Sequence, residues 1–446
     1  MSKTVSRRTF MKQAAIASAA PLVLPRLSFA QPANSRLQHA AIGVAAQGKH
    51  DLGNIASHDM VDVVALCDID AVSLQRAAEL YPNARLYRDW REMLAQEEGK
   101  IDSVSVATPD HTHAPASYSA IKQGLHIFCE KPLTHEVYEA RKVTVAARKA
   151  GVVTQMGNQI HSHEYYRTAV HWVREGAIGK VKEWHSWVGP GAIFTTDDKK
   201  YPAGTDAIPE HLDWNLWCGT GPLIPFKEGE YHPFWWRRYR AFGGGAVGDF
   251  GCHIFDPVYS ALDITNPLQV LGRAESYSDE VHPAWSVINY TFPGTPMTAY
   301  GTICATWRDG GLKPDKLLSP HLAEDYELPP SGSMLVGEEG TLIIPHVGKP
   351  QLHPVADFEN YPVPQLEERS HYHEFVDACL GRVQTTGSNF DFAGPMAEAV
   401  LLGNIANRLP GQALEWNARR CRFSNNSDAN KLLRRSYRDG FEVRGL

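Results

Sequence analysis

Residues 43–48 read GVAAQG and join a short apolar run to a helix-length segment. In this G-x-A-x-x-G pattern Gly43 permits a tight turn, Gly48 permits close helix–strand packing, and Ala45 narrows the backbone approach to a pyrophosphate. Asp68 lies twenty residues beyond Gly48, at the end of the next apolar run. A carboxylate there accepts hydrogen bonds from ribose hydroxyls and repels a 2′-phosphate. The pattern predicts a dinucleotide site that favours NAD over NADP, and a glycine turn with a capping aspartate is the alternative.

Asp249 and His253 are spaced i, i+4 and follow three consecutive glycines at 243–245. On a helix this spacing puts both side chains on one face, where they can address one ligand. The glycines let the chain turn tightly into that helix. A pair that only stabilises the helix is the alternative interpretation.

The elements that must position these residues divide the chain in two. Between residues 37 and 158, short apolar runs such as 40–44, 61–66 and 101–107 alternate with helical patterns. Strand–helix units of this length predict a doubly wound parallel sheet, the Rossmann arrangement. We therefore predict an NAD-binding domain over residues 31–158.

The pattern changes after residue 158. Alternating strands there predict a C-terminal α+β domain with an open, mostly antiparallel sheet over residues 159–446. Helices are predicted near 371–380 and 393–408, and residues 190–245 are irregular and rich in Trp, Pro and Gly. The predicted strands are 181–188, 269–276, 286–292, 297–306, 334–344 and 414–423.

Four motifs resemble those of one known family. They are ATPDHTH at 107–113, GLHIFCEKP at 124–132, EGAIGKV at 175–181 and GDFGCH at 248–253. Their types and order resemble the Gfo/Idh/MocA family, which is named for glucose–fructose oxidoreductase, inositol dehydrogenase and rhizopine catabolism. The resemblance covers roughly residues 38–260. The C-terminal third resembles the family only in its predicted series of strands.

The resemblance implies that Lys131 sits beside the nicotinamide and the reacting hydroxyl, and that Asp249 and His253 meet it from the second domain. Family members mostly oxidise a ring hydroxyl of a sugar or cyclitol, or reduce the matching ketone. The residue types agree with this chemistry, because a histidine suits the general base and a cation stabilises a developing alkoxide. A surface lysine is the alternative for Lys131.

The predicted cofactor contacts combine the glycine turn with the family motifs. His113 is interpreted as lining the cofactor cleft, and Asn158 either touches the nicotinamide side or caps a strand end. The complete set is Gly43, Ala45, Gly48, Asp68, Thr108, Pro109, His113, Glu130 and Asn158.

Two other residue groups carry weaker signals. Three H-x-H pairs, at 111/113, 161/163 and 371/373, lack further convergent ligands, so no metal site is predicted. Aromatic residues gather in and near the irregular stretch, where they either stack on sugar rings or form core. We lean towards a carbohydrate pocket to which Asp213, Arg237 and Arg238 add hydrogen bonds. The aromatic residues are Trp184, Trp187, Trp214, Trp217, Tyr231, Phe234, Trp235, Trp236 and Tyr239.

The N-terminal 30 residues resemble a twin-arginine export signal. SRRTFMK at 6–12 precedes an Ala-rich run at 14–24 and the small-x-small pattern at 28–30. The run is too short and weak to span a bilayer, so no stable membrane insertion is expected. Loss of this segment changes the net charge from −6 to −11, which disfavours nucleic acid as a partner. The expected partners are the twin-arginine machinery, a small carbohydrate and a second copy of the chain.

A periplasmic location constrains the reaction, because little free NAD is expected there. The cofactor should stay bound and be restored within each cycle. One scheme couples oxidation of one sugar to reduction of another sugar or a ketone. A second is redox-assisted glycoside hydrolysis: oxidation at C3, elimination across C2, hydration and reduction, with a further base among His163, Tyr165, Tyr166 and His185. A sugar-binding protein without catalysis is the non-enzyme alternative.

Overall fold

The computed structural model describes residues 36–275 and 278–446. A first sheet of six parallel strands has the order β3-β2-β1-β4-β5-β6, which confirms the predicted doubly wound sheet. Its strands are β1 (Leu37–Ile42), β2 (Val61–Cys67), β3 (Arg85–Tyr87), β4 (Ser103–Val106), β5 (His126–Glu130) and β6 (Thr154–Gly157). The connecting helices are α2 (Gln47–Ala56), α3 (Ala71–Leu80), α4 (Trp90–Gln96), α5 (Asp110–Lys122) and α6 (Val137–Ala150).

Local sequence explains where these helices begin and end. Asp70 starts α3, because its carboxylate accepts hydrogen bonds from the backbone N–H groups of Val72 and Ser73. Gly151 ends α6 in a left-handed conformation, with φ of 67°. The central strand β4 is buried on both faces, so all of its residues are buried.

The second sheet has nine strands in the order β13-β12-β11-β7-β10-β9-β8-β14-β15. The pair β7–β10 is parallel and the other pairs are antiparallel, which confirms the predicted sheet type. The strands are β7 (Val181–Trp187), β8 (Gln269–Ala274), β9 (Ser286–Pro293), β10 (Thr302–Arg308), β11 (Gly332–Gly337), β12 (Thr341–Pro345), β13 (Gln351–His353), β14 (Ala413–Asn417) and β15 (Arg422–Phe423).

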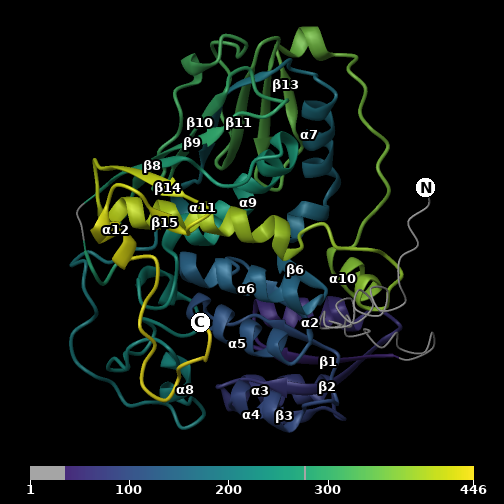
Figure 1. Cartoon of the computed structure of the whole chain (residues 1–446), viewed down its shortest axis with the longest axis vertical. Helices are drawn as coiled ribbons and strands as arrows, with labels where there is room; N and C mark the ends of the chain where they lie inside the picture. Colours follow the sequence, from purple (N-terminus) through teal and green to yellow (C-terminus); the bar gives the residue numbers. More distant parts are fainter. Residues whose placement is uncertain (1–35, 276–277) are drawn as a thin grey trace, which may run out of the picture. The chain divides into compact units, whose positions relative to one another are not determined.

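Helices of this part cover one face of the sheet and also reach the first domain. Figure 1 shows α11 (Phe390–Arg408) running between the nine-stranded sheet and α6, with α9 (Gly245–Leu262) beside it. The rings of Phe255 and Tyr259 on α9 pack against Trp184 and Phe292 of the sheet. The remaining helical segments are η1 (Gln159–Ser162), α7 (Glu164–Arg174), η2 (Pro190–Ala192), α8 (Trp214–Cys218), η3 (Trp235–Arg238), η4 (Lys316–Leu318), η5 (Val355–Phe358), α10 (His371–Cys379) and α12 (Ser427–Lys431).

Helix α10 returns to the first domain late in the chain. It packs on α2, and its Tyr372 ring stacks on Phe128 of β5 at 5.4 Å between centroids. The sequence predicted this helix, but its periodicity carried no information on where the helix packs. Among the described residues, no helix has both the length and the apolar character needed to cross a membrane.

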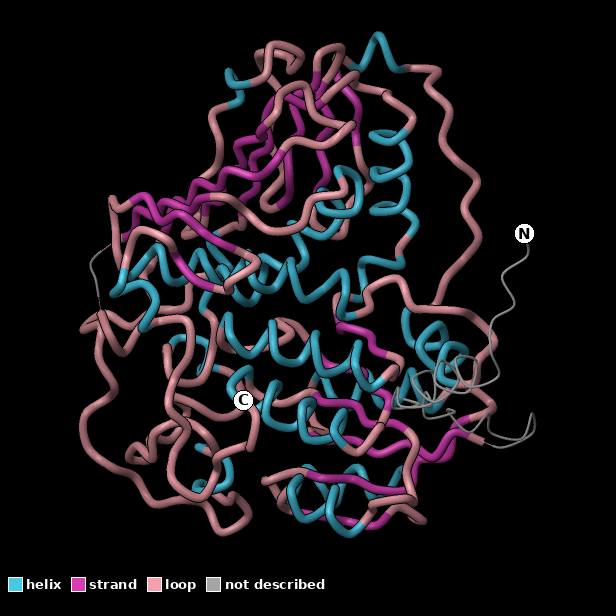
Figure 2. Tube along the Cα trace, viewed as in Figure 1, coloured by secondary structure: helices cyan, strands magenta, loops and turns pink. Residues whose placement is uncertain are grey.

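Most of the aromatic residues assigned to a carbohydrate pocket are core instead. Seven of the nine are buried, two of them on β7 and the others in a separate cluster inside the irregular stretch, whose loops dominate that part of the trace in Figure 2. Phe234 is 47% exposed and Trp235 is 37% exposed. The interpretation as a sugar-stacking pocket is therefore wrong for the seven buried residues. The two on β7 pack in the core of the sheet domain, and the other five form the apolar core that a long segment with little regular structure needs. The seven residues are Trp184, Trp187, Trp214, Trp217, Tyr231, Trp236 and Tyr239.

Candidate active site

The predicted catalytic lysine and aspartate meet across the two domains. Lys131 follows the last residue of β5, and its Nζ donates to Asp249 Oδ1 at 2.7 Å and to the Asp249 carbonyl at 3.0 Å. The two side chains are 16% and 12% exposed. Arg237 Nε donates to the same Oδ1 at 3.1 Å. One carboxylate oxygen therefore contacts two cations, one from each domain.

The charges of Asp249, Lys131 and Arg237 determine the protonation states of the lysine and the aspartate. Burial alone would raise the pKa of Asp249, but the charges of Lys131 and Arg237 outweigh burial and hold it well below its usual range. Burial likewise lowers the pKa of Lys131, and the negative charges of Asp249 and Glu130 reverse that effect and raise it. Lys131 is therefore an ammonium and Asp249 a carboxylate across the neutral range.

His253 lies one turn after Asp249 on α9, as the i, i+4 spacing predicted. Burial, followed by the charge of Lys131, lowers the pKa of His253 well below its usual value, so the ring is neutral at pH 7. Its Nδ1 is buried and has no hydrogen-bond partner in the described part of the chain. The His346 ring lies 5.4 Å away, centroid to centroid. A neutral imidazole with an uncommitted nitrogen beside an ammonium is suited to accept a hydroxyl proton.

The start of α9 is held by close packing of the three glycines. A Cβ on Gly243 would lie 2.8 Å from the Cα of Arg237, and Gly245 has a φ of +61°. Gly244 N donates to Asp110 Oδ2 of α5 at 2.8 Å. Because Asp110 begins α5 in the first domain, this bond ties the start of α9 to the Rossmann domain. Burial raises the pKa of Asp110 to about 7.

The turn between β1 and α2 fits a dinucleotide. Gly43 has a φ of +82°, and a Cβ there would lie 2.3 Å from the Ala107 carbonyl oxygen. A Cβ on Gly48 would lie 2.1 Å from the Gly43 carbonyl oxygen, so both positions require glycine. The N-cap residue is Ala46, so no side chain covers the first turn of α2, whose N–H groups form the usual place for a phosphate.

Asp68 lies just beyond the end of β2, at the sheet edge that carries the glycine turn. Its Oδ2 accepts from Val44 N at 3.0 Å and its Oδ1 accepts from Asp70 N at 3.0 Å, which fixes the carboxylate against the glycine turn. Burial raises the pKa of Asp68. Each oxygen keeps a second lone pair for a ribose hydroxyl.

The other predicted cofactor residues lie at the same sheet edge with different environments. Ala45 is exposed on the turn, and Thr108 and Pro109 join β4 to α5, with Pro109 as the N-cap. The His113 ring is buried, and its two nitrogens lie 2.7 Å from the carbonyl oxygens of Pro132 and Thr108. Burial lowers the pKa of His113 to about 4, so the neutral ring donates to one of them.

Asn158 lies just after β6 and is fully buried. Its amide nitrogen donates to Asp256 on α9, and its oxygen accepts from Ser388 Oγ at 2.6 Å. The side chain therefore joins the first domain to α9, and contact with a nicotinamide remains a prediction.

Three residues of the candidate site were not predicted from the sequence in the positions that they occupy. Arg237 had been assigned to substrate hydroxyls, yet it binds Asp249. Asp110 lies inside a recognised motif, and its link to Gly244 depends on tertiary packing. His346 follows β12, where no motif marks it, and its Nδ1 lies 3.1 Å from Tyr166 Oη. Burial lowers the pKa of His346 to about 4.

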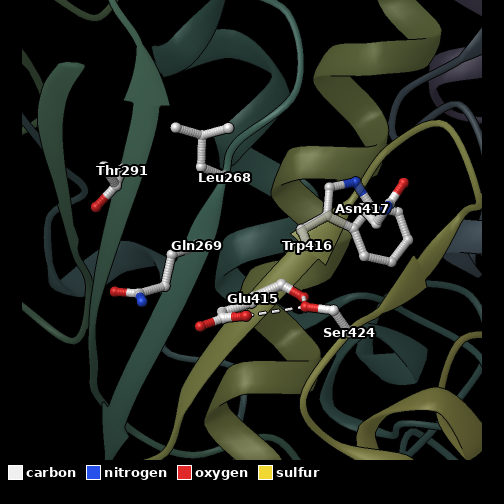
Figure 3. Close-up of a pocket in the computed structure, with 7 residues that line it drawn as sticks. All are labelled: Leu268, Gln269, Thr291, Glu415, Trp416, Asn417 and Ser424. Carbon is white, nitrogen blue, oxygen red and sulfur yellow. Dashed lines mark hydrogen bonds between the residues drawn. The ribbon is translucent and has the colours of Figure 1, made fainter. Parts of the chain in front are cut away.

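Other polar groups do not form a competing centre. Within residues 36–275 and 278–446, no three His, Cys, Asp or Glu side chains converge as a metal site would require. A surface pocket at β8 and β14 holds one ionisable side chain, Glu415, whose carboxylate accepts from Ser424 Oγ at 2.9 Å (Figure 3). That pocket lacks paired acid and base groups.

Comparison with known proteins agrees with both domains. Residues 37–158 match "Oxidoreductase family, NAD-binding Rossmann fold", and residues 181–300 match "Oxidoreductase family, C-terminal alpha/beta domain". D-apiose dehydrogenase of Paraburkholderia graminis is 30% identical over 144 residues, which cover 32% of this chain and 38% of that protein. A glycosyl hydrolase family 109 protein of Stenotrophomonas maltophilia is 28% identical over 247 residues, which cover 51% of this chain and 53% of that protein. The matches thus span about half or less of these relatives.

A solved structure has a similar fold over most of this chain. The inositol dehydrogenase homolog of Azotobacter vinelandii, in complex with NADH and myo-inositol, superposes with a TM-score of 0.56 at 16% identity. The match covers 86% of this chain and 98% of that one.

Proposed function

Because the chain belongs to the Gfo/Idh/MocA oxidoreductase family, we propose that it oxidises a ring hydroxyl of a sugar or glycoside with NAD. The observation that carries the proposal is the 2.7 Å contact of Lys131 Nζ with Asp249 Oδ1, with His253 one turn further along the same helix. This arrangement supplies a fixed cation and a neutral base at one place.

The side chains divide the work of removing a hydroxyl proton. Neutral His253 accepts the proton, and the Lys131 ammonium stabilises the oxyanion that develops. Asp249 holds the ammonium in place and keeps it protonated. Bound NAD would accept the hydride, held by the glycine turn at 43–48 and by Asp68. The Asp68 carboxylate favours NAD over NADP, because a 2′-phosphate would meet its charge.

We propose in addition that the protein is exported and keeps its cofactor. The twin-arginine pattern at 6–12 supports this location and lies outside the described residues. Twin-arginine export carries folded proteins, so NAD bound before transfer would travel with the chain. The reaction would then restore the cofactor in each cycle, either with a second sugar or ketone or within one substrate.

Redox-assisted glycoside hydrolysis is the second candidate. The match to a glycosyl hydrolase family 109 protein favours it, at 28% identity over 247 residues. Among the bases suggested for C2, Tyr166 is linked to the site, because its hydroxyl contacts His346 and His346 lies against His253. His163 instead caps α7, and His185 lies on β7 beside Glu183 at 3.0 Å.

The test uses purified protein without added NAD. The protein is denatured and removed, and the absorbance of the remaining solution shows whether a dinucleotide was bound. Incubation with single sugars, with sugar–ketone mixtures and with nitrophenyl glycosides then separates the schemes. Product only in mixtures supports coupled oxidation and reduction, whereas nitrophenol release with solvent deuterium at C2 supports hydrolysis.

A matched pair of variants controls this test. Lys131→Met should abolish both activities and leave the bound dinucleotide, while Lys149→Met, on the exposed end of α6, should change neither. Full activity of Lys131→Met would refute the proposed role. Bound dinucleotide with no turnover of any substrate would favour the sugar-binding alternative.

A further inference from the structure

Two carboxyl side chains meet inside the first domain, behind the proposed site. Asp51 comes from α2 and Glu130 from the end of β5, and they are 0% and 5% exposed. Gln159 bridges them, because its Nε2 donates to Glu130 Oε1 at 2.6 Å and lies 3.5 Å from Asp51 Oδ1. None of the reaction steps described above uses this pair.

The pair has polar partners, and no Lys or Arg side chain of the described residues is bound to it. Tyr372 Oη and Gln47 Nε2 donate to Asp51 Oδ1 at 2.9 Å and 2.8 Å. Asp51 Oδ2 is buried and has no hydrogen-bond partner in the described residues. Leaving a carboxylate oxygen buried without a donor is costly, and a proton shared with the neighbouring carboxyl removes that cost.

The charged groups around the pair do not neutralise it. The Lys131 ammonium opposes the rise in the pKa of Glu130, but it is bound to Asp249, and His50 on α2 has only a minor influence on Asp51. Burial raises the pKa of Asp51 to about 6, and burial together with the Asp51 charge raises the pKa of Glu130 well above its usual value. Two buried carboxyls this close hold one proton between them near neutral pH.

The pair also lies at the edge of the sheet where the ligand must bind. In open α/β sheets ligands lie beyond the carboxyl ends of the strands, and Glu130 is the last residue of β5. Lys131 N donates to Glu130 Oε2 at 3.2 Å. A Cβ on Gly157 of β6 would lie 2.2 Å from Glu130 Oε1, so the glycine makes room for this carboxyl.

We propose that Asp51 and Glu130 form a proton store that follows the charge of the bound nicotinamide. The pair loses its proton when the positively charged oxidised ring binds, and regains one when the ring becomes neutral on reduction. The inference rests on the proposed function. Oxidation of the alcohol transfers a hydride to NAD and a proton from the hydroxyl to His253. His253 then gives up that proton and becomes neutral again, while the pair takes up one proton, so the ring loses one positive charge as the pair loses one negative charge. Reduction of a ketone reverses both transfers, so a retained cofactor cycles without a net charge change in the interior.

The test counts protons rather than turnover. Full-length protein freed of dinucleotide is titrated with NAD⁺ and with NADH by calorimetry at pH 7, in two buffers of different ionisation enthalpy. We expect NAD⁺ to release a larger fraction of a proton than NADH does. Glu130→Gln should abolish the difference. Glu374→Gln removes another largely buried carboxyl, on α10 beside Tyr372, and should preserve it.

A second measurement needs no cofactor. Difference infrared spectra between the native protein and Glu130→Gln, both free of dinucleotide at pH 7, should show the carbonyl band of a protonated carboxyl that the variant lacks. Equal proton counts for both dinucleotides, or absence of that band, would overturn the inference. If neither dinucleotide binds, the proposed function fails as well, whereas binding with equal proton counts removes only the proton store.

Discussion

Asp249→Asn removes the charge between Lys131 and Arg237 and keeps the shape of the side chain. At 2.7 Å and an effective dielectric constant of about 20, the attraction of Lys131 to Asp249 is about 6 kcal/mol before desolvation, which offsets much of it. Removing one partner of a buried pair leaves the other charge unpaired. We therefore expect the free energy of unfolding at pH 7 to fall by about 3–5 kcal/mol. Because the folded pKa of Asp249 is lowered, this stabilisation is complete above its unfolded pKa of about 3.9 and is lost as pH falls below that value.

The same substitution should change the pH dependence of catalysis. In the native protein Asp249 opposes the effect of burial and raises the pKa of Lys131, so the ammonium persists to alkaline pH. Without that charge only Glu130 opposes burial and Arg237, so the pKa of Lys131 falls. Activity should then decrease on the alkaline side, where the native protein is still active. The loss of kcat at pH 7 should be about 10²–10⁴.

Urea unfolding and pH–rate profiles measure both effects. Asp263→Asn is the matched control, because Asp263 ends the same helix with an exposed side chain and pairs with Arg174 at 3.2 Å. Its effect should stay within about 0.5 kcal/mol. An Asp249→Asn protein with native stability and an unchanged alkaline limb would refute the assignment of Asp249 as the group that holds Lys131.

Three further outcomes are expected. Gly43→Ala should lose dinucleotide binding in a calorimetric titration, because its Cβ would lie 2.3 Å from the Ala107 carbonyl oxygen at a φ of +82°. Binding at native affinity would contradict the role of the glycine turn at 43–48 as the dinucleotide site. His253→Ala should lower kcat by about 10²–10⁴ with little change in dinucleotide affinity, and an unchanged kcat would show that another group is the base. Trp217→Ala should lower the free energy of unfolding by about 3–5 kcal/mol, whereas the exposed Trp235→Ala should leave it nearly unchanged; the opposite order in urea unfolding would show that the aromatic cluster is not core.

The sequence predicted the parts of the molecule whose signals are local. The glycine turn with Asp68 and the i, i+4 spacing of Asp249 and His253 are short-range patterns, and the structure has the expected turn and helix. The unbroken apolar strands and the later alternating ones predicted the two sheet types for the same reason. Aromatic residues in an irregular stretch carry no such period. Whether they face solvent or one another depends on tertiary packing, and the structure buries most of them.

Contacts between distant segments lay beyond that reasoning. His346 reaches the site from the end of β12, and Tyr372 reaches Asp51 from α10, more than 300 residues along the chain. Neither residue belongs to a recognised motif. Their positions follow from how the nine-stranded sheet and the returning helix pack on the first domain.

Helix α9 links this packing to the chemistry, because one of its faces serves both. Asp249 binds Lys131 at the end of β5, and Asp256, seven residues later, accepts from Asn158 and lies 2.9 Å from His161 Nδ1. Burial lowers the pKa of His161, but the Asp256 charge outweighs it and raises the pKa. A shift of α9 along its axis would break the contacts at β5 and after β6 together. His253, the proposed base, lies between these two anchors, so its position relative to the Rossmann domain is fixed from both ends.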